Sequence, residues 1–374
     1  MRASPPEPGD SGMRILTIIL FVSVLTVVQL CGQTGDSLPA ARHKLDFLPI
    51  LVYDSDAGVG YGVKSFFLNY LDRDESFDVV LFNSSKGERW YKIVFSIPDF
   101  ERREGKIYPL ALDCIVEYDK WINYSFFGVV TTSAYNHQES YTREPLEYSL
   151  NLSRGFTSLF IGRIGLKYAV IRNFDFQQRG TLQHLPPGLN SGTVRKLSLA
   201  ANLRYDSRNS FINPSRGIVL EEEMESVPGW DMNNVRFTRY SLAFQSYLPT
   251  PLENSTLALR GWFQALDGEN LPVQVLLPIG GGSTLRGEPQ DRYLDKVSAV
   301  VNLEARFPVY WRFGGIAGYD FGRVWHNVRE LNLYQWSLNP TLGVRFYFDT
   351  FIVRLDVGFG RDETGFYLNF GQMF

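Results

Sequence analysis

The sequence predicts an all-β fold, a transmembrane antiparallel β-barrel of about 16 strands with an extracellular loop inserted into its lumen. Three observations predict it: hydrophobicity that alternates with period two, strands about ten residues long with charges at their centres, and long connectors gathered at one rim. Strands of soluble β-sandwiches usually run about five or six residues. In hydrocarbon every backbone polar group must pair internally, so such strands must close into a barrel.

The N-terminal segment has the features of a cleavable secretory signal, which we place at residues 1–36. A basic start at Met13 precedes about 16 apolar residues, fewer than the roughly 20 that a helix needs to span a bilayer. Residues 1–12 are polar and rich in proline, so Met13 is an alternative start. Residues 37–374 are expected to form the outer-membrane barrel domain.

The alternation is clearest in the stretch PLEYSLNLSR, where Leu146, Tyr148 and Leu150 share one face and Glu147 and Ser149 the other. The same period predicts strands at 45–54, 58–70, 77–84, 88–97, 107–118, 144–153, 158–171, 194–206, 217–226, 235–247, 255–266, 297–307, 313–325, 337–347, 351–359 and 365–374. This even number is what a single-chain bacterial barrel requires.

The lengths of the connectors distinguish the two rims of the predicted barrel. The long connectors follow odd-numbered strands, at 119–143, 172–193, 267–296 and 326–336. Most connectors after even-numbered strands are shorter, such as 154–157 and 348–350. Long outer loops and short periplasmic turns are typical of bacterial outer-membrane barrels, so both ends of the chain are expected on the periplasmic side.

Charge and composition exclude other classes of protein. The formal net charge of −3 supplies no basic field for nucleic acid, and two cysteines make no disulfide scaffold. The four histidines show neither metal spacing nor a nucleophile motif, so we expect no enzyme, no metal and no cofactor. Asp54 and Asp56 could bind calcium, but a turn is the favoured interpretation.

One long connector carries a glycine-rich stretch, LPIGGGSTLRGEPQDRY, that precedes a strand with a single inward carboxylate. The candidate site residues are Gly280, Gly281, Gly282, Leu285, Arg286 and Gly287 in the loop, and Asp320 and Gly322 on the strand. Glycines clear space around the carboxylate, and an arginine can bind it as a bidentate donor. We expect the loop from Asp267 to Lys296 to fold into the lumen and Arg286 to pair with Asp320. The alternative is a solvated arginine among turn glycines.

Four stretches together resemble the BamA/TamA superfamily, the bacterial surface antigen family of outer-membrane assembly and translocation barrels. They are FLPILVYDSDAGVGYG, RYDSRNSFINPSRG, GGGSTLRGE and GYDFGRVW. The resemblance implies the same contact between Arg286 and Asp320. Glu288 stands where the family usually has an aromatic residue after the arginine–glycine pair.

The last strand, GFYLNFGQMF, places Phe366, Leu368, Phe370 and Phe374 on one face and ends on phenylalanine. This resembles the C-terminal signal by which outer-membrane barrels are recognised for insertion. The alternative is an ordinary aromatic edge strand.

The acidic residues Glu221, Glu223 and Glu225 share one strand face, opposite Lys196 and Arg204 on the neighbouring strand. Because like charges on one face need partners, we expect these residues to form charge pairs inside the lumen rather than a substrate site.

The resemblance implies a protein that assists insertion or translocation of proteins, or of lipids, at the bacterial outer membrane. Its partners would be outer-membrane lipid, client outer-membrane proteins and a periplasmic protein. Family members normally carry periplasmic polypeptide-transport-associated domains before the barrel. Only about ten residues separate the expected cleavage region from the first strand here, too few for such a domain. The mechanism would use a weak seam between the first and last strands. The alternative is a passive pore or structural barrel with a lumen-plugging loop.

Overall fold

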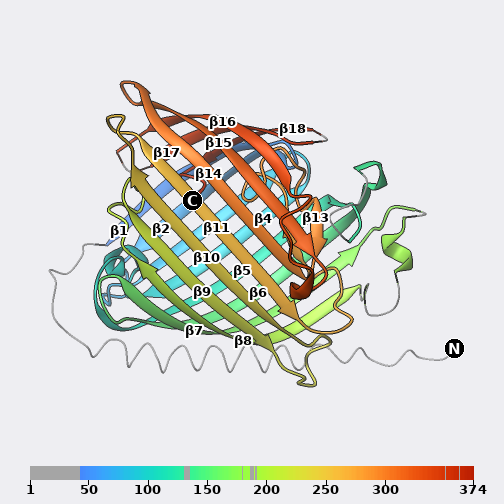
Figure 1. Cartoon of the computed structure of the whole chain (residues 1–374). Coiled ribbons are helices and arrows are strands. Elements are labelled where there is room, and N and C mark those ends of the chain that lie inside the picture. The colour runs from blue at the N-terminus through green and yellow to red at the C-terminus, as the bar shows by residue number, and fades with distance from the viewer. Residues whose placement is uncertain are drawn as a thin grey trace.

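The computed structural model describes residues 43–129, 135–178, 180–185, 189, 192–349, 351–361 and 363–374. Over these residues the chain forms one closed antiparallel barrel of 16 strands, in which β1 closes onto β18 (Figure 1). The predicted fold class is therefore confirmed. The signal peptide expected at 1–36 lies outside the described residues.

The first half of the barrel consists of β1 (Lys44–Asp54), β2 (Gly58–Leu68), β3 (Ser76–Ser84), β4 (Glu88–Ile97), β5 (Tyr108–Phe126), β6 (Glu139–Gly155), β7 (Phe160–Phe174) and β8 (Thr193–Asp206). The second half consists of β9 (Gly217–Val227), β10 (Phe237–Pro249), β11 (Thr256–Asp267), β14 (Val297–Tyr310), β15 (Phe313–Trp325), β16 (Ser337–Tyr347), β17 (Ile352–Phe359) and β18 (Thr364–Phe370). Short helical turns occur at α2 (Phe100–Arg103), η1 (Tyr135–His137), η2 (Leu182–His184) and η3 (Val328–Glu330). No helix in the described part of the chain is both long and apolar enough to cross a membrane.

The predicted bounds of one connector and of the last strand are wrong. The connector expected at 119–143 is mostly strand, because β5 runs to Phe126 and β6 begins at Glu139. Tyr124 and Tyr141 pair across this extension and pack with loop residues such as Leu271, so tertiary contacts prolong a ladder whose own alternation is weak. The strand expected at 365–374 ends at Phe370.

The wall has an apolar outer face and a polar inner face. On β10, Leu242 and Phe244 are exposed outward, whereas Arg239 and Ser241 line a cavity in the lumen. The connectors that follow β5, β7, β11 and β15 are long and lie at one rim, here called the long-connector rim. At the opposite, short-connector rim every connector has ten residues or fewer.

The acidic face of β9 forms charge pairs inside the lumen. Glu225 lies 2.7 Å from Lys196 Nζ, and Glu221 lies 3.6 Å from Arg204 on β8. Arg239 of β10 contacts both Glu225 and Glu223. Each buried or half-buried carboxylate therefore has a cationic partner, as the strand pattern predicts.

Candidate functional site

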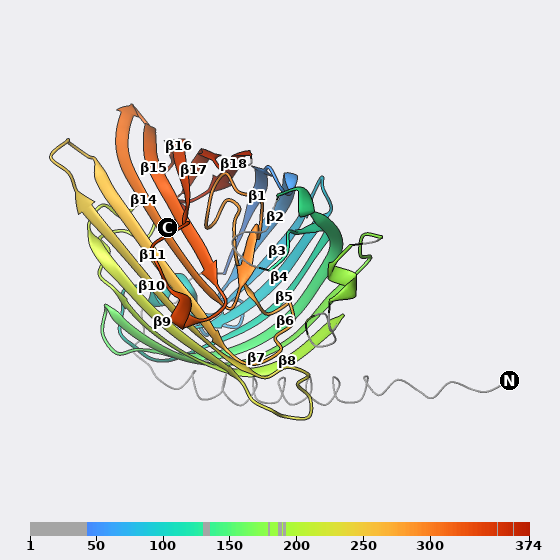
Figure 2. The same ribbon diagram turned by 45° about the vertical axis from the view of Figure 1, so that its right-hand side comes forward.

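The connector between β11 and β14 folds back into the barrel instead of leaving it. It contains a short hairpin of β12 (Leu277–Ile279) and β13 (Tyr293–Asp295), which is seen within the ring of strands in Figure 2. Ile279 and Leu285 are almost fully buried against Val300 and Val324 of the wall. The loop is therefore anchored by apolar packing as well as by charge.

Arg286 lies at the centre of this inserted loop with a fully buried side chain. Its Nε donates to Asp320 Oδ2 at 2.8 Å and its Nη2 donates to Asp320 Oδ1 at 2.9 Å. This is the bidentate arrangement in which two parallel N–H groups match one carboxylate. The structure thus brings together the two residues that the sequence selected, from positions 34 residues apart.

Two further carboxylates, which sequence reasoning did not assign to the site, complete the shell around the guanidinium. Arg286 Nη1 lies 2.8 Å from Glu304 Oε1 on β14 and 3.1 Å from Asp356 Oδ2 on β17. Arg306 contacts Glu304 and Arg345 contacts Asp356, which offsets the added negative charge. The signal was present, since both carboxylates occupy the polar face of alternating strands.

Amide side chains fix the loop backbone in place. Asn302 donates to Thr284 O at 2.8 Å and to Asp320 Oδ1 at 2.7 Å, and Asn339 donates to Arg286 O at 2.8 Å. The Gly287 amide donates to the Tyr367 hydroxyl of β18 at 3.0 Å. We call Arg286, Asp320, Glu304 and Asp356, with these supporting contacts, the loop lock.

The glycines let the loop approach the wall closely. Gly287 has a φ of +91°, and a Cβ there would collide with the backbone of Gly358 and Gly360. At Gly322, a Cβ would lie 2.9 Å from Ile279 Cδ1, so this strand position receives the loop side chains.

The remaining loop glycines and Glu288, which follows Gly287, also make specific contacts. Gly280 and Gly281 have positive φ, and Gly282 lies against Tyr367. Thr284 Oγ1 accepts a hydrogen bond from the Gly280 amide at 2.8 Å. Glu288 is buried and accepts a hydrogen bond from Ser337 Oγ at 3.0 Å.

The C-terminal residues leave the wall after β18. Phe366, at 47% exposed, lies on the outer face, whereas Phe374 is buried beside Tyr247 and Ala258. Leu368 and Phe370 are half-buried on β18. Because residues 371–374 turn into the lumen, Phe374 does not continue the outward face that was expected for it.

Contacts with β14 and β16 hold this C-terminal tail, residues 371–374. Arg306 Nη2 donates to Phe374 O at 3.0 Å, and its guanidinium lies 5.0 Å from the centre of the Phe374 ring. Arg345 donates to Gln372 Oε1 at 2.9 Å. The label for the C-terminus accordingly lies near β11 and β14 in both views (Figures 1 and 2).

The junction of β1 and β18 is the least paired part of the wall. Its register contains Tyr53↔Leu368 and Asp54↔Tyr367, near the long-connector rim. β1 pairs with β2 along its whole length of 11 residues. Within the described chain, residues 44–52 of β1 have no register partner on β18, which leaves an open length of β1 toward the short-connector rim.

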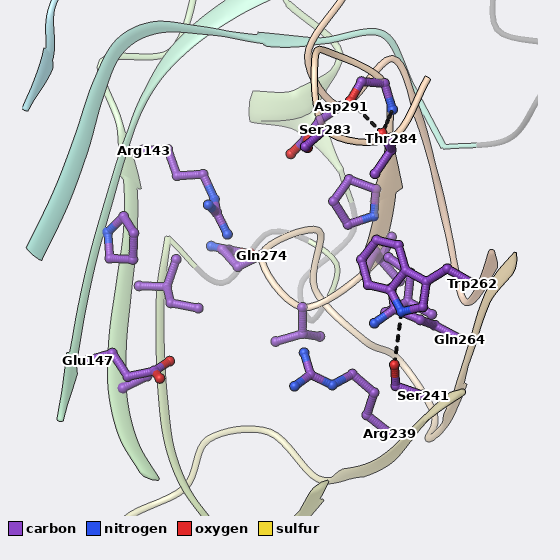
Figure 3. A pocket seen from close by; sticks show the side chains of 18 of the residues that line it. Arg143, Glu147, Arg239, Ser241, Trp262, Gln264, Gln274, Ser283, Thr284 and Asp291 are labelled. Carbon is purple, nitrogen blue, oxygen red and sulfur yellow. Dashed lines mark hydrogen bonds between the residues drawn. The ribbon is translucent and has the colours of Figure 1, made fainter. Parts of the chain in front are cut away.

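The lumen beside the loop lock contains a cavity of about 710 Å³ with mixed charges (Figure 3). Its lining includes Arg143, Glu147 and Arg239 from the wall and Asp291 from the loop. Trp262 Nε1 donates to Ser241 Oγ at 3.0 Å across one side. The described residues contain no group of three side chains that could hold a metal ion. Asp54 accepts a hydrogen bond from the Asp56 amide at 2.8 Å, as in a turn.

Comparisons with known proteins agree with this geometry. The chain matches BamA from Haemophilus ducreyi lacking POTRA domains 1–3, with a TM-score of 0.68 and 13% identity over 93% of this chain and 78% of that one. CdiB from Acinetobacter baumannii matches with a TM-score of 0.58 and 15% identity, over 88% of this chain and 60% of that one. CdiB from Escherichia coli matches with a TM-score of 0.60 and 13% identity, over 89% of this chain and 64% of that one. No curated protein sequence matches significantly.

At these identities the solved structures show a shared fold. The Omp85 superfamily domain, however, matches residues 69–374, which is most of the sequence and includes the inserted loop, the loop lock and the C-terminal strand. The expected resemblance to outer-membrane assembly barrels is therefore confirmed, and the chain belongs to the Omp85 superfamily.

Proposed function

We propose that this protein spans the bacterial outer membrane and assists the insertion or translocation of other proteins there, without enzymatic chemistry. The observation that supports this most directly is the sparse register between β1 and β18. An exposed strand edge is a template on which another strand can form backbone hydrogen bonds. The open length of β1 would offer such an edge to a client outer-membrane protein.

The orientation follows from the connectors. The long-connector rim would face the outside and the short-connector rim the periplasm, as in other bacterial barrels. The open length of β1 then lies toward the periplasm, the side from which clients arrive. A separate periplasmic protein would deliver them, and outer-membrane lipid would surround the apolar outer wall.

The test is to lock the seam. In a background with Cys31→Ser and Cys114→Ser, Tyr53→Cys with Leu368→Cys would join β1 to β18, because these residues are register partners. Cells depleted of the native protein and complemented with the locked variant should lose other barrels from the outer-membrane proteome. Reducing agent should restore them.

The matched control joins β1 to β2 instead, at Leu51→Cys with Tyr61→Cys, a pair that is already in register. This variant should complement whether oxidised or reduced. If the locked seam also complements fully, the seam does not open in function. An uptake defect without loss of barrels would favour the passive pore plugged by the inserted loop.

A further inference from the structure

The middle of β1, residues 47–52, is apolar on both faces. It differs in this from β9, whose inner face carries charge pairs. Phe47 and Leu51 face outward with exposed fractions of 63% and 61%. Leu48, Ile50 and Val52 face inward and line a second lumen cavity. A water-filled lumen gives no reason to place apolar side chains there, since their contact with water is unfavourable.

This second cavity has a volume of about 550 Å³ and continues the apolar surface onto β3 and β4. Val80, Phe82 and Trp90 line it, and Ser283 of the inserted loop closes one side. Gly60 on β2 explains how the surface becomes continuous. A Cβ at Gly60 would collide with the Phe82 ring, so the absence of a side chain lets that ring lie over β2.

The cavity borders the open length of β1. Asn369 and Phe370 of β18 line it opposite Leu48 and Ile50, but the register of β1 and β18 stops at Tyr53 and Asp54. A flexible apolar chain in the bilayer can therefore pass between the two strands without crossing an ordered ladder of hydrogen bonds.

One cation at this cavity has an unmet hydrogen-bonding group. Arg354 of β17 lines the cavity and is 7% exposed. Its Nη1 lies 3.3 Å from Asp356 Oδ2, a carboxylate that already serves Arg286 and Arg345. Among the described residues its buried Nε has no hydrogen-bond partner. A buried donor without an acceptor is costly, so this group favours an anionic ligand.

The other cations at the cavity are already paired. Lys64 lies 3.3 Å from Asp78, and Lys92 lies 2.9 Å from Glu117. Asp54 and Glu88 also line the cavity and repel an anion there. The attraction for an anion is therefore confined to Arg354, whose planar donors match a phosphate group.

We propose that this cavity binds one acyl chain of an acidic phospholipid, which enters from the bilayer between β1 and β18 and places its phosphate at Arg354. An acyl chain fits the apolar part of the lining better than a peptide does, because the side chains there cannot satisfy the polar groups of a peptide backbone. That part is formed by Leu48, Ile50, Val52, Val80 and Phe82. The site goes beyond the proposed function: it does not depend on whether client strands pair with the edge of β1.

Photolabelling tests the proposal. The full chain is placed in bilayer nanodiscs of phosphatidylethanolamine that contain phosphatidylglycerol with a diazirine in one acyl chain. Adducts on Leu48, Ile50 and Val80 are expected, in addition to those on Phe47 and Leu51 from the surrounding bilayer. Phosphatidylcholine with the same photoreactive chain has the same phosphate but also a choline cation, which Arg354 repels. It should therefore label the inward residues several-fold less.

Matched variants separate the cavity from the outer surface. Ile50→Gln should reduce inward labelling several-fold, whereas Leu51→Gln, its outward neighbour, should leave it unchanged. Arg354→Gln should abolish the preference for the acidic lipid while apolar labelling persists. A heat-modifiable band on gels confirms that each variant is folded.

Labelling confined to outward residues overturns the proposal. So does a cross-linked peptide, from a client or from residues 1–42, in place of lipid. Inward labelling with an acidic preference that survives Arg354→Gln overturns the assignment of the phosphate site. None of these outcomes depends on the assembly assay, so the seam-locked variant can fail to complement whether or not lipid binds.

Discussion

The loop lock and the seam meet at β18, where Tyr367 contacts the inserted loop and is in register with Asp54, yet they are built in opposite ways. At the lock, one buried arginine joins β14, β15 and β17 through three carboxylates. At the seam, β1 and β18 share the register Tyr53↔Leu368 and Asp54↔Tyr367. Separating β14 from β15 would expose a charged centre and break a full ladder, whereas separating β1 from β18 breaks few hydrogen bonds, each worth about 0.5–1.5 kcal/mol.

This difference shows how a closed barrel can have one opening. The lock joins the inserted loop to β14, β15 and β17, the wall behind the seam, whereas residues 44–52 of β1 have no register partner on β18. The C-terminal tail contributes on the other side, because it turns the end of the chain toward Tyr247 instead of along β1. The lock and the C-terminal tail are also connected, since Arg306 contacts both Glu304 of the lock and Phe374 of the tail.

The largest effect is expected at Arg286. Arg286→Ala would leave three buried carboxylates without their shared cation, which should destabilise the folded barrel by about 3–5 kcal/mol. Arg286→Lys should also be destabilising, because a lysine cannot form the bidentate contact with Asp320. Urea unfolding in detergent, followed by the heat-modifiable band on gels, measures the change.

The control is Arg312→Ala, which removes an exposed arginine paired with Asp349 at 3.0 Å. Exposed pairs contribute about 0–1 kcal/mol, so unfolding should hardly change. Equal urea midpoints for Arg286→Ala and Arg312→Ala would contradict the role given to the lock.

The next effect in size is expected at the tail. Phe374→Ala should destabilise the barrel by up to about 3 kcal/mol, because a buried ring leaves a cavity beside Tyr247 and Ala258. Phe366→Ala, on the exposed outer face of the same C-terminal region, should cost less in detergent. Unfolding midpoints compare the two, and membrane yield in cells tests whether Phe374 also acts as an insertion signal.

A larger loss of stability for Phe366→Ala than for Phe374→Ala would contradict the inward anchoring of the tail. Loss of membrane yield for Phe374→Ala with an unchanged unfolding midpoint would instead assign the residue to recognition during assembly.

Much of the fold could be predicted because period-two alternation is a local signal. It gave the closed barrel, the sorting of connectors and the inward charge pairs such as Lys196–Glu225. The ends of β5 and β6 at the long-connector rim were not predicted, because they are held by loop residues such as Leu271, which are distant in the sequence.

The site was predicted only in part for the same reason. Glycines around Asp320 and a lone arginine in a flexible loop selected one pair. Glu304 and Asp356 were visible as polar-face residues, but alternation alone does not show which wall a loop touches. The inward turn of Phe374 left no signal in the alternation, because GQMF can continue a strand or leave it.

A smaller effect is expected at the seam itself. Ser55 Oγ accepts from the Phe366 amide at 2.8 Å and donates to its carbonyl at 3.4 Å. Ser55→Ala should weaken the seam by about 0.5–1.5 kcal/mol without changing global unfolding. Faster amide exchange in β18 alone would agree, whereas faster exchange in β14 and β15 as well would show that the seam is not a separate unit.

The smallest effect concerns pH. Asp56, in the turn after β1, accepts a hydrogen bond from the Gln290 amide of the inserted loop at 2.9 Å. Burial and the neighbouring Asp54 raise the pKa of Asp56 from 3.8 to about 7. Because the pKa of Asp56 is higher in the folded state, its protonated carboxyl contributes to the free energy of unfolding. This contribution is fully present below about pH 4 and is lost as pH rises through 7.

The free energy of unfolding, measured in urea, should therefore fall between about pH 4 and pH 7, beyond the change that the other titrating groups cause. Asp56→Asn, which stays neutral, should remove this extra dependence. An identical pH profile in the variant would exclude Asp56 as its source.

Residue-resolved hydrogen exchange in nanodiscs measures the central contrast most directly. The account predicts slow exchange throughout β14 and β15, and fast exchange at the β1 amides between residues 44 and 52 that point away from β2. Uniformly slow exchange around the whole barrel, with those β1 amides as protected as the β14 amides, would contradict it.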